Sequence, residues 1–405
     1  MSLLTLNAGS QSIRFVLHES CDPRRKLLVG QIERIGLPGT SFRVERVGAA
    51  AEVRTLENAP RGFEATAKWL LEWLAAQPEG ARLEAVGHRV VHGLRRSCPA
   101  RVTAALLDEL RGNVPFDPEH LPSEIALMEA ALRDWPAIPG IACFDTAFHR
   151  TLPRVASLLP LPRRFQAMGI ERYGFHGLSY TFLMEELARL GGPAEAQARV
   201  VLAHLGNGAS LAAVRSGLCI DTSMSFTPTG GLPMSTRSGD LDPSILAHLL
   251  STERLDAASL QHLVTHESGL LGLSGTSSDV RDLLAREPGE VHAAEALALF
   301  CFQVRKWIGA FAAALGGLDT LVFAGGIGEN ASSLRERICG GLEFLGLEID
   351  GERNARHAPL ISCDASRVRV RVVRTDEAAV IARLTLETLG RASGEVLSSE
   401  QARVP

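Results

Sequence analysis

Short apolar runs recur along the chain, and each ends at a turn that contains Gly or Asp. Runs of this length between turn residues are typical of buried β-strands. Between them, apolar residues recur at steps of three and four, as on one face of an amphipathic helix. Alternating strands and helices predict an α/β fold. The predicted strands are residues 3–6, 83–91, 138–144, 200–203, 318–323 and 368–373; helices are predicted over residues 63–76 and along the stripe Leu297, Cys301, Val304, Ile308, Phe311 and Leu315.

Composition limits the kinds of partner. With 405 residues, 46% of them hydrophobic, the chain can build roughly two or three domains with large cores. A net charge of −4 gives no basic field for nucleic acid or an anionic membrane. The most apolar helical stretch, residues 294–315, carries Arg305 and Lys306, so no membrane span is expected. Seven scattered cysteines without a Cys-x-x-Cys pair, and no secretory signal, predict a reduced, cytoplasmic protein.

Two turns rich in Gly, Ser and Asn follow apolar runs: NAGSQS at residues 7–12 and HLGNGAS at residues 204–210. Glycine lets the backbone approach a ligand closely, and small polar side chains with main-chain N–H groups can bind anionic oxygens. Either turn alone could be a plain hairpin, but the pair predicts a clamp around a polyphosphate. No Gly-Lys-Ser or Gly-Lys-Thr occurs, which excludes a P-loop. The turns lie about half a chain apart, as a duplicated α/β unit would place them.

A third glycine-rich element, FAGGIGEN at residues 323–330, follows the predicted strand 318–323. We expect it to lead into a helix that Ser332 caps, an arrangement that places a nucleotide against backbone and a helix N-terminus. A simple strand-to-helix turn is the alternative. Its glycine spacing is not the dinucleotide-binding fingerprint, and no acidic residue follows at the distance a Rossmann fold requires.

Seven motifs in chain order resemble the acetate kinase and propionate kinase family. They are NAGSQSIR, GHRVVHG (87–93), FDTAFH (144–149), RYGFHG (172–177), HLGNGAS, TPTGGLPMSTRSGDLDP (227–243) and GGIGEN. The resemblance implies two RNase H-like α/β lobes with a cleft between them, in the superfamily of sugar kinases, actin and heat-shock ATPases. The N-terminal lobe would be residues 1–149, completed by about 379–405, and the nucleotide-binding lobe residues 150–378.

The same resemblance implies the reaction: reversible, direct in-line transfer of the γ-phosphoryl group of ATP to acetate, which gives acetyl phosphate and ADP. Closure of the cleft would exclude water, which competes as a phosphoryl acceptor. A homodimer is also implied. Propionate or another short acid is the alternative substrate, and a non-catalytic, actin-like nucleotide binder is a more distant one. The persistence of Arg89, His176 and Arg237 argues against a mere binder.

Catalytic roles carry over by resemblance to Arg89, Asp145, His176 and Arg237. An arginine that stabilises a moving phosphoryl group can be worth ~10³- to 10⁵-fold. Arg89 would also hold the substrate carboxylate, and its guanidinium would be costly to bury in an apolar run without an anion. Because a carboxylate substrate is already ionised near neutrality, we expect Asp145 to orient Mg²⁺ or the arginines. His176 would donate to the phosphoryl group, although a core histidine is the alternative.

The resemblance further supplies the binding residues. The acyl pocket would be lined by Val91, Phe175 and Pro228. Mg²⁺, for which Mn²⁺ can substitute, would be held by Asn7 and Glu377; a zinc pair at His88 and His92 is disfavoured because their segment reads as strand. ATP or ADP would contact Ser10, Ser12, Arg14, His204, Leu205, Gly206, Asn207, Gly208, Asp279, Val280, Arg281, Gly326, Ile327, Gly328, Glu329 and Asn330.

Three positions depart from the family pattern. Gln11 stands where the turn usually has serine, and Arg14 where it has lysine; both can donate to phosphate, but arginine is a planar fork, not a compact ammonium. Residues 117–122 read DPEHLP where relatives read APLHNP. Glu119 thus replaces a leucine of the acyl pocket, and a carboxylate beside an anionic substrate is unfavourable unless it points away or is paired. The identity of the acid therefore depends on this segment.

Overall fold

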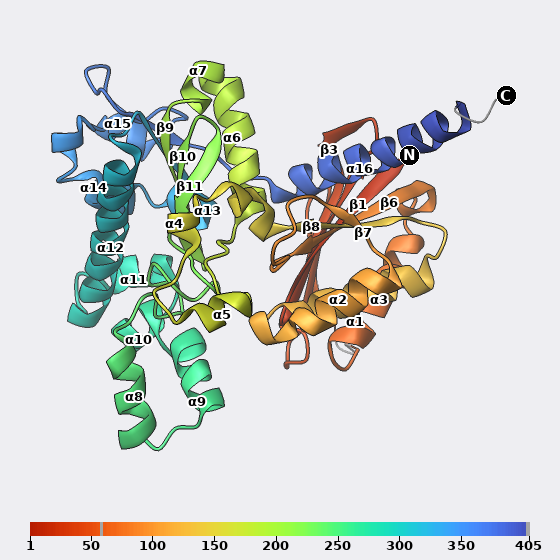
Figure 1. The fold of residues 1–405 in the computed structure, drawn as a ribbon, viewed down its shortest axis with the longest axis horizontal. Coiled ribbons are helices and arrows are strands. Elements are labelled where there is room, and N and C mark those ends of the chain that lie inside the picture. The colour runs from red at the N-terminus through yellow and green to blue at the C-terminus, as the bar shows by residue number, and fades with distance from the viewer. Residues whose placement is uncertain (57–59, 402–405) are drawn as a thin grey trace. The chain divides into compact units, whose positions relative to one another are not determined.

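The computed structural model describes the backbone of residues 1–56 and 60–401 and the side chains of all these residues up to 390. The described chain divides into two compact units (Figure 1). The first is Met1–Ala147 together with the chain from Asp376 onward, and the second is Phe148–Thr375. Glu377, which the boundary expected near residue 378 would leave in the second lobe, belongs to the first unit.

The first unit is built on an eight-stranded sheet in the order β5-β4-β3-β2-β1-β6-β8-β7. Strands β1 and β2 form an antiparallel hairpin, and β1, β6 and β8 run parallel. The strands are β1 (Ser2–Gly9), β2 (Ser12–Glu19), β3 (Asp22–Glu33), β4 (Ser41–Arg46), β5 (Glu52–Thr55), β6 (Leu83–Val90), β7 (Ala100–Arg101) and β8 (Gly140–Phe144). The helices are α1 (Phe63–Ala75), α2 (Ala104–Asn113), α3 (Leu121–Asp134) and α16 (Glu377–Gln401), with short turns η1 (Gly80–Arg82) and η2 (Val114–Phe116).

Side-chain alternation along β1 explains why helices cover both faces of this sheet. Leu4 and Leu6 point into the core that α1 and α3 close. Leu3, on the opposite face, packs with Ala85 of β6 and Ala382 of α16. Because successive residues of a strand face opposite sides, a strand that is buried at every position from Ser2 to Leu6 must be covered on both faces. The C-terminal segment therefore returns to complete the first unit.

The second unit holds a five-stranded sheet in the order β11-β10-β9-β12-β13. Helix α6 packs on one face through Tyr180, Leu183 and Leu187, and α12 also contacts β9 and β10. The strands are β9 (Arg199–Leu205), β10 (Ala209–Arg215), β11 (Leu218–Thr222), β12 (Thr320–Ala324) and β13 (Arg369–Val372). The helices are α4 (Arg154–Ser157), α5 (Arg163–Ala167), α6 (Gly177–Gly191), α7 (Pro193–Ala196), α8 (Pro243–Thr252), α9 (Ala257–His262), α10 (Gly269–Ser274), α11 (Val280–Arg286), α12 (Val291–Leu315), α13 (Gly325–Asn330), α14 (Ser332–Cys339) and α15 (Gly351–Ala355), with turns η4 (Leu263–Glu267) and η5 (Glu343–Leu345); η3 (Asp145–Thr151) crosses from one unit to the other.

The two sheets share one topology. In the first unit the order β3-β2-β1-β6-β8 is an antiparallel meander followed by two parallel strands, and β11-β10-β9-β12-β13 repeats it in the second. This is the strand order of an RNase H-like domain. Each predicted phosphate turn is the tip of the central hairpin: β1–β2 in one sheet and β9–β10 in the other.

The third glycine-rich element differs from the sequence expectation. Residues 325–330 are themselves the short helix α13, not a turn before a helix. Helix α14 does begin at Ser332, but its N-cap residue is Ala331 and no side-chain hydrogen bond caps it. The prediction of a serine cap was wrong, because Ser332 is the first helical residue and its hydroxyl lies beyond the capping position.

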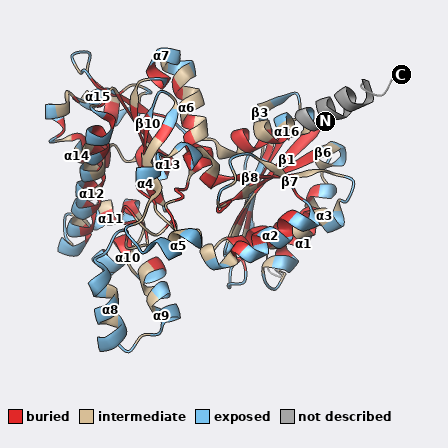
Figure 2. Ribbon diagram, viewed as in Figure 1, coloured by how far each residue is buried: buried red, intermediate tan, exposed pale blue. Residues whose placement is uncertain are grey.

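Helix α12 is the core helix that the apolar stripe predicts. All six stripe residues, from Leu297 to Leu315, are buried (Figure 2). Among the described residues it is the one helix long and apolar enough to meet the criteria of a membrane span, with a hydropathy of 1.3. The core helix of a soluble protein passes the same test, so this match is weak evidence for a membrane.

Candidate active site

In the first unit, Arg89 on β6 is the centre of a polar cluster. Its Nη2 donates to Oδ2 of Asp145 at 2.5 Å, and its Nη1 donates to Oδ1 of Asn7 at 3.3 Å. Its Nε lies 3.9 Å from Oε2 of Glu377. These residues come from the ends of β6 and β1, the start of η3 after β8, and the first residue of α16. Parallel strands meet at their carboxyl ends, which is where ligand sites of α/β sheets gather.

The Arg89 cluster is mostly buried: the side chain of Asp145 is 0% exposed and that of Arg89 16%. Burial alone would lower the pKa of Arg89, but the charges of Asp145 and Glu377 raise it above its ordinary value. The guanidinium is therefore not buried unpaired: Asp145 and Glu377 offset its charge, and a bound anion at Arg89 stays a prediction. Two carboxylates face one guanidinium, so the cluster carries a formal excess of one negative charge.

Val91, the predicted pocket residue, follows Arg89 by two positions and has a buried carboxylate behind it. Its backbone N–H donates to Oε1 and Oε2 of Glu124 at 3.1 and 3.2 Å. Burial, and then the charge of Asp117, raise the pKa of Glu124 well above its ordinary value. Glu124 lies in the first turn of α3, so it holds the end of β6 to the start of that helix.

The DPEHLP segment leads into this helix. Asp117 is buried, and its Oδ1 lies 2.9 Å from Nδ1 of His120, the N-cap residue of α3. Burial works to raise the pKa of Asp117, but hydrogen bonding to His120 brings it below the ordinary value. Glu119 is half-buried. The segment thus adds a paired, buried carboxylate at Asp117 as well as the glutamate that the sequence comparison singled out.

In the second unit, the β9–β10 hairpin brings three predicted residues together. A Cβ built on Gly208 would lie 3.2 Å from Nε2 of His176 and 3.6 Å from Nη1 of Arg237. The ring of His204 stacks on that of His176, with centroids 4.4 Å apart. A glycine turn, two imidazoles and a guanidinium therefore surround one point of backbone, a setting suited to phosphate oxygens.

Arg237 lies in an irregular loop between β11 and α8 that the hairpin helps to hold. Its Nη1 donates to the carbonyl oxygen of Pro228 at 3.2 Å. The loop bonds back to the hairpin, since the N–H of Ser235 donates to the carbonyl oxygen of Asn207 at 3.2 Å. The guanidinium is thus held by the backbone of Pro228 and by Sδ of Met234, 3.8 Å from Nη1. Of the predicted pocket residues, Pro228 contacts Arg237 directly and Phe175 precedes His176 in the chain.

Helix α13 lies against the same hairpin. Gly325 has φ +77°, and a Cβ there would lie 2.6 Å from the carbonyl oxygen of Leu205, so only glycine fits. The backbone nitrogen of Gly326 is 3.8 Å from the Cβ position of Gly206. Oε1 of Glu329 accepts the N–H groups of Gly325 and Thr375 at 3.0 and 3.1 Å. Glu329 therefore links the start of α13 to the chain at Thr375. The predicted residues Ile327, Gly328 and Asn330 lie on the same helix.

Arg335 is a site residue that the sequence reading missed. Fully buried on α14, it donates to the carbonyl oxygens of Gly328 and Glu329 at 2.8 and 3.0 Å. Burial lowers its pKa to about 10. One signal could have found it: Arg335 occupies a position on the apolar stripe of α14, between Leu334 and Ile338. A charge on an apolar stripe must find a partner.

Other predicted nucleotide residues lie apart from these contacts. Arg14 is exposed on β2, where it pairs in register with Asn7, and Ser10 and Ser12 lie at the hairpin tip. Asp279 caps α11 by accepting the N–H of Arg281 at 2.8 Å. The Arg281 side chain, 89% exposed, pairs with Asp279, and Val280 is buried.

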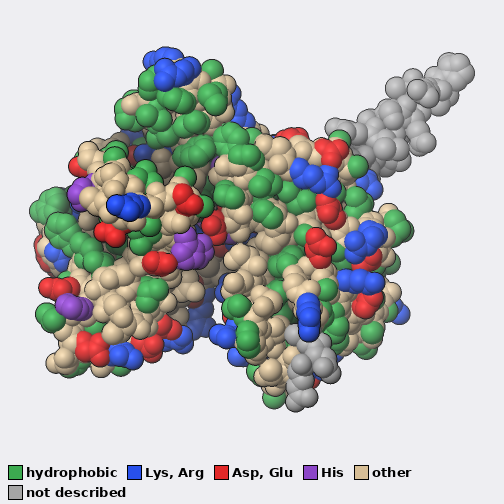
Figure 3. Space-filling view, turned by 90° about the horizontal axis from the view of Figure 1, so that it is seen from below, with side chains coloured by type: hydrophobic (Ala, Val, Ile, Leu, Met, Phe, Trp, Pro, Cys, Tyr) green, Lys and Arg blue, Asp and Glu red, His purple; other side chains and the backbone are tan. Residues whose placement is uncertain are grey.

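On the face drawn in Figure 3, acidic and basic side chains are interspersed, in line with the small net charge of the chain. Anion binding therefore rests on local geometry. Two units of RNase H-like topology, each with its polar groups at the hairpin and strand ends, define a class of fold suited to binding phosphate oxygens.

Comparisons with known proteins specify the class further. Residues 2–383 match the model of the Acetokinase family. The chain is 43% identical to an acetate kinase from Methylocella silvestris over 397 residues, 96% of this chain and 98% of the relative. It is also 43% identical to a propionate kinase from Citrobacter rodentium over 390 residues, 94% of this chain and 95% of the relative. An acetate kinase structure from Porphyromonas gingivalis has a TM-score of 0.86 at 35% identity, covering 96% and 99% of the two chains. The chain therefore belongs to the acetokinase family, and it is an enzyme, a carboxylate kinase that uses ATP or ADP as co-substrate.

Proposed function

We propose that this enzyme phosphorylates acetate with ATP, reversibly, by direct in-line transfer to give acetyl phosphate and ADP. The observation that carries the proposal is the family match over residues 2–383, supported by a buried arginine cluster in one unit and a glycine cradle lined by Arg237 and two imidazoles in the other. Arg89 binds the acetate carboxylate, and His176 and Arg237 stabilise the transferring phosphoryl group. Asp145 orients Arg89. It does not have to remove a proton from acetate, because that acid is already ionised near neutral pH.

The remaining predicted residues fall to the nucleotide. The glycines of the β9–β10 hairpin and those of α13 bind ATP through backbone N–H groups, with Arg14, Ser10 and Ser12 at the other hairpin and Asp279 to Arg281 at the nucleoside. A hydroxamate assay tests the catalytic assignment. Arg237→Ala is expected to lower kcat by about 10³-fold or more, the effect of losing an arginine that stabilises transferred phosphate. The exposed Arg356 serves as control: Arg356→Ala should retain wild-type turnover. Full turnover by Arg237→Ala would contradict the assignment.

Acetate is the preferred acid, and propionate the alternative. Val91, Phe175 and Pro228 supply apolar surface for a short acyl chain, and all three are buried. Comparing kcat/KM for acetate, propionate and butyrate decides between them. One extra methylene is worth about 1–3 kcal/mol in a fitted pocket, a factor of about 10 to 200. A higher kcat/KM for propionate than for acetate would overturn the choice of acid.

A divalent cation fits the Arg89 cluster. Asn7 and Glu377 offer an amide and a carboxylate oxygen, and Mg²⁺ in kinases is held by one or two such ligands with phosphate oxygens and water. The formal excess of negative charge around Arg89 also favours the binding of a cation. Mg²⁺, or Mn²⁺ in its place, would offset the charge of the nucleotide phosphates. Chelation should abolish activity, addition of either ion should restore it, and Glu377→Gln should raise the Mg²⁺ concentration required for half-maximal rate. An unchanged requirement would argue against Glu377 as ligand.

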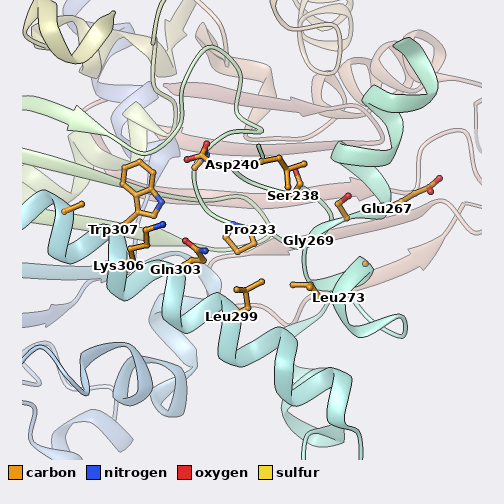
Figure 4. A pocket seen from close by; sticks show the side chains of 15 residues that line it. Pro233, Ser238, Asp240, Glu267, Gly269, Leu273, Leu299, Gln303, Lys306 and Trp307 are labelled. Atoms are coloured by element: carbon orange, nitrogen blue, oxygen red, sulfur yellow. The ribbon is translucent and has the colours of Figure 1, made fainter. Parts of the chain in front are cut away.

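The protein forms a homodimer through its second unit. Helix α8 has no buried residue, although Ile245 and Leu250 are apolar and 44% and 38% exposed. Beside this region lies a pocket of about 580 Å³ (Figure 4). Pro233 and Asp240, from the loop that carries Arg237, line one side, and α12 lines the other. A helix that contacts α9 but buries none of its apolar residues leaves surface for a partner, and a second copy of this chain supplies one of matching apolar character.

Sedimentation equilibrium tests the homodimer. Wild type is expected to sediment as a dimer and the double variant Ile245→Asp/Leu250→Asp as a monomer. Val155→Asp, at a side chain that is 81% exposed on α4, is the control and should remain dimeric. A monomeric wild type, or a dimeric double variant, would refute this surface.

The protein works in the cytoplasm. All seven cysteines are free thiols, and four of them are buried, as suits a reducing compartment. Fractionation of cells that produce the protein should recover it with soluble cytoplasmic markers. Recovery in the periplasm or the membrane fraction would contradict this location.

A further inference from the structure

The two ring nitrogens of His176 have different surroundings. His176 is the N-cap residue of α6 and adopts a left-handed conformation, with φ 57°. Its Nδ1 lies 2.9 Å from Oγ of Ser210 on β10. Its Nε2 faces the glycine turn, 3.2 Å from the Cβ position of Gly208. Around the ring stand two other groups able to carry charge, His204, stacked on its face, and Arg237. One nitrogen is thus held by the protein, and the other faces the proposed phosphate cradle.

Behind Ser210 stands a buried phenol. Oη of Tyr180 lies 2.5 Å from Oγ of Ser210, and both residues are 0% exposed. Tyr180 is one helical turn after His176, and its N–H donates to the carbonyl oxygen of His176 at 3.0 Å. Its ring is wedged edge-on against His149, with centroids 5.7 Å apart. Tyr180, Ser210 and His176 therefore form one continuous hydrogen-bonded chain that ends at the cradle.

His149 is itself fixed. Its Nε2 lies 2.9 Å from the carbonyl oxygen of Phe175, to which only an N–H can donate. Its Nδ1, 3.2 Å from Sγ of Cys219, is then an acceptor in the neutral ring. Burial raises the pKa of the Cys219 thiol, so the thiol keeps its one proton, for which the carbonyl oxygen of Asp221, 3.4 Å from Sγ, is a second acceptor beside His149. This support holds the Tyr180 ring in place from the side opposite α6.

The direction of the chain follows from donor and acceptor strength. The Ser210 hydroxyl has one proton, so it donates to one neighbour and accepts from the other. A phenol is the more acidic hydroxyl, with an ordinary pKa of about 10, whereas an imidazole nitrogen is the strongest acceptor of the three groups. The favoured order is Tyr180 O–H to Ser210, and Ser210 O–H to Nδ1. The reverse order would leave a bare Nε2 lone pair facing anionic oxygens.

We propose that Tyr180 is a positioning residue that acts through Ser210 to hold His176 in the neutral form protonated on Nε2, with that N–H presented to the transferring phosphoryl group. The inference rests on the proposed function for one point, that the Nε2 N–H donates to a transferring phosphoryl group. The order of the hydrogen bonds among Tyr180, Ser210 and His176 does not depend on that function. It predicts that the phenolic hydroxyl contributes to turnover without touching either substrate.

The chain contains two tyrosines, which supplies a matched pair of variants. Tyr180→Phe removes the hydroxyl at the start of the chain. Tyr173→Phe removes a hydroxyl that donates only to the carbonyl oxygen of Gly169, at 2.6 Å. Tyr180→Phe is expected to lower kcat by about 10-fold, the value of one buried hydrogen bond, with KM for ATP and acetate within about twofold of wild type. Tyr173→Phe should keep the wild-type kcat.

The state of the ring is read directly by ¹⁵N NMR of histidine-labelled protein, with His176→Gln used to assign the signal. Wild type should show His176 protonated on Nε2, and Tyr180→Phe should shift it toward the form protonated on Nδ1. Ser210→Ala, which breaks the chain at its middle, should have the same effect. A wild-type ring protonated on Nδ1, or an unchanged ring and kcat in both variants, would overturn the proposal. If acyl phosphate formation itself failed, the ring signal would still report on the hydrogen-bond order, so the two failures are distinguishable.

Discussion

Replacement of Arg335 by methionine is expected to loosen the glycine helix α13 and weaken ATP binding. The guanidinium makes five hydrogen bonds. In addition to the two carbonyl oxygens of α13, it donates to Oδ1 and the carbonyl oxygen of Asn354 at 2.9 and 2.8 Å, and to Nδ1 of His357 at 3.1 Å. None of these acceptors is a carboxylate. The residue thus serves to satisfy backbone and amide oxygens where α13, α14 and α15 meet.

The magnitude follows from those bonds. Five bonds at about 1 kcal/mol each set an upper estimate of about 5 kcal/mol. Methionine also avoids the cost of burying a charge, which offsets part of the loss, so Arg335→Met should destabilise the second unit by about 3 kcal/mol. Arg335→Lys keeps the charge but replaces a planar fork by three donors on one atom, and should cost about 2 kcal/mol.

Urea unfolding followed by circular dichroism measures the loss, and hydrogen exchange of residues 325–339 localises it. We expect KM for ATP to rise about fivefold, equivalent to about 1 kcal/mol of lost loop order, while KM for acetate stays the same. Arg337→Met is the control on the same helix: its partner Glu287 is partly exposed, so the change should cost about 1 kcal/mol or less. The reasoning is refuted if Arg335→Met loses less than Arg337→Met, or if KM for acetate rises in parallel.

Three further outcomes follow from single contacts. Glu124→Gln keeps an acceptor for the N–H of Val91 and should be more stable than wild type above about pH 5. Desolvation and a buried neighbouring carboxylate raise the Glu124 pKa, so wild type loses stability as pH rises past the unfolded value of about 4.3. A wild type more stable than the variant at pH 8 would contradict this. Glu195→Gln should act oppositely. Burial would raise the Glu195 pKa, but hydrogen bonds from two arginines of β13 bring it below the ordinary value. The glutamate therefore stabilises wild type fully above about pH 4.3, and this stabilisation vanishes as pH falls through the folded pKa. Urea titrations of wild type and variant at pH 7 and pH 3 check it. Gly325→Ala forces a Cβ onto the carbonyl oxygen of Leu205 and should lower the free energy of unfolding by about 2–4 kcal/mol, measured by thermal unfolding. A loss below about 1 kcal/mol would show that the backbone can move to accept the methyl group.

Hydrophobic pattern was sufficient to predict the layers of the fold. The helix expected over residues 63–76 is α1, Phe63–Ala75, and the apolar stripe from Leu297 is buried on α12. Both have a long, regular period, which is the strongest local signal in a sequence. Strand ends differ by one to three residues, as for β8, which starts at Gly140 where residue 138 was expected. Local pattern fixes the kind of element better than its limits, because neighbouring strands decide where pairing stops.

Some residues of the candidate site stand in a recognisable local sequence motif, and others do not. The glycines of the two hairpins stand in recognisable turns and lie at the hairpin tips, and those of α13, also marked by local sequence, lie in a short helix against the β9–β10 hairpin. Glu124 and Arg335 are not in any such turn. Each is a charged residue on the apolar stripe of its helix, beside Ile125 in one case and Ile338 in the other. Their partners lie on other elements, at Val91 after β6 for Glu124 and on α13 and α15 for Arg335, and the pattern of a single helix does not record those contacts.

The charge around the two hairpins explains why one topology, used twice, supports different chemistry. Around Arg89, Asp145 and Glu377 outnumber the one guanidinium, which favours a cation beside any anion bound there, and Arg14 of β2 adds a second guanidinium opposite Asn7. Near the β9–β10 hairpin, Arg237 and two imidazoles surround a glycine turn, a setting suited to phosphate oxygens. The backbone of the hairpin supplies the same donors in both sheets. In the function proposed above, the charged residues beside each hairpin would decide which hairpin holds the metal and which holds the phosphoryl group.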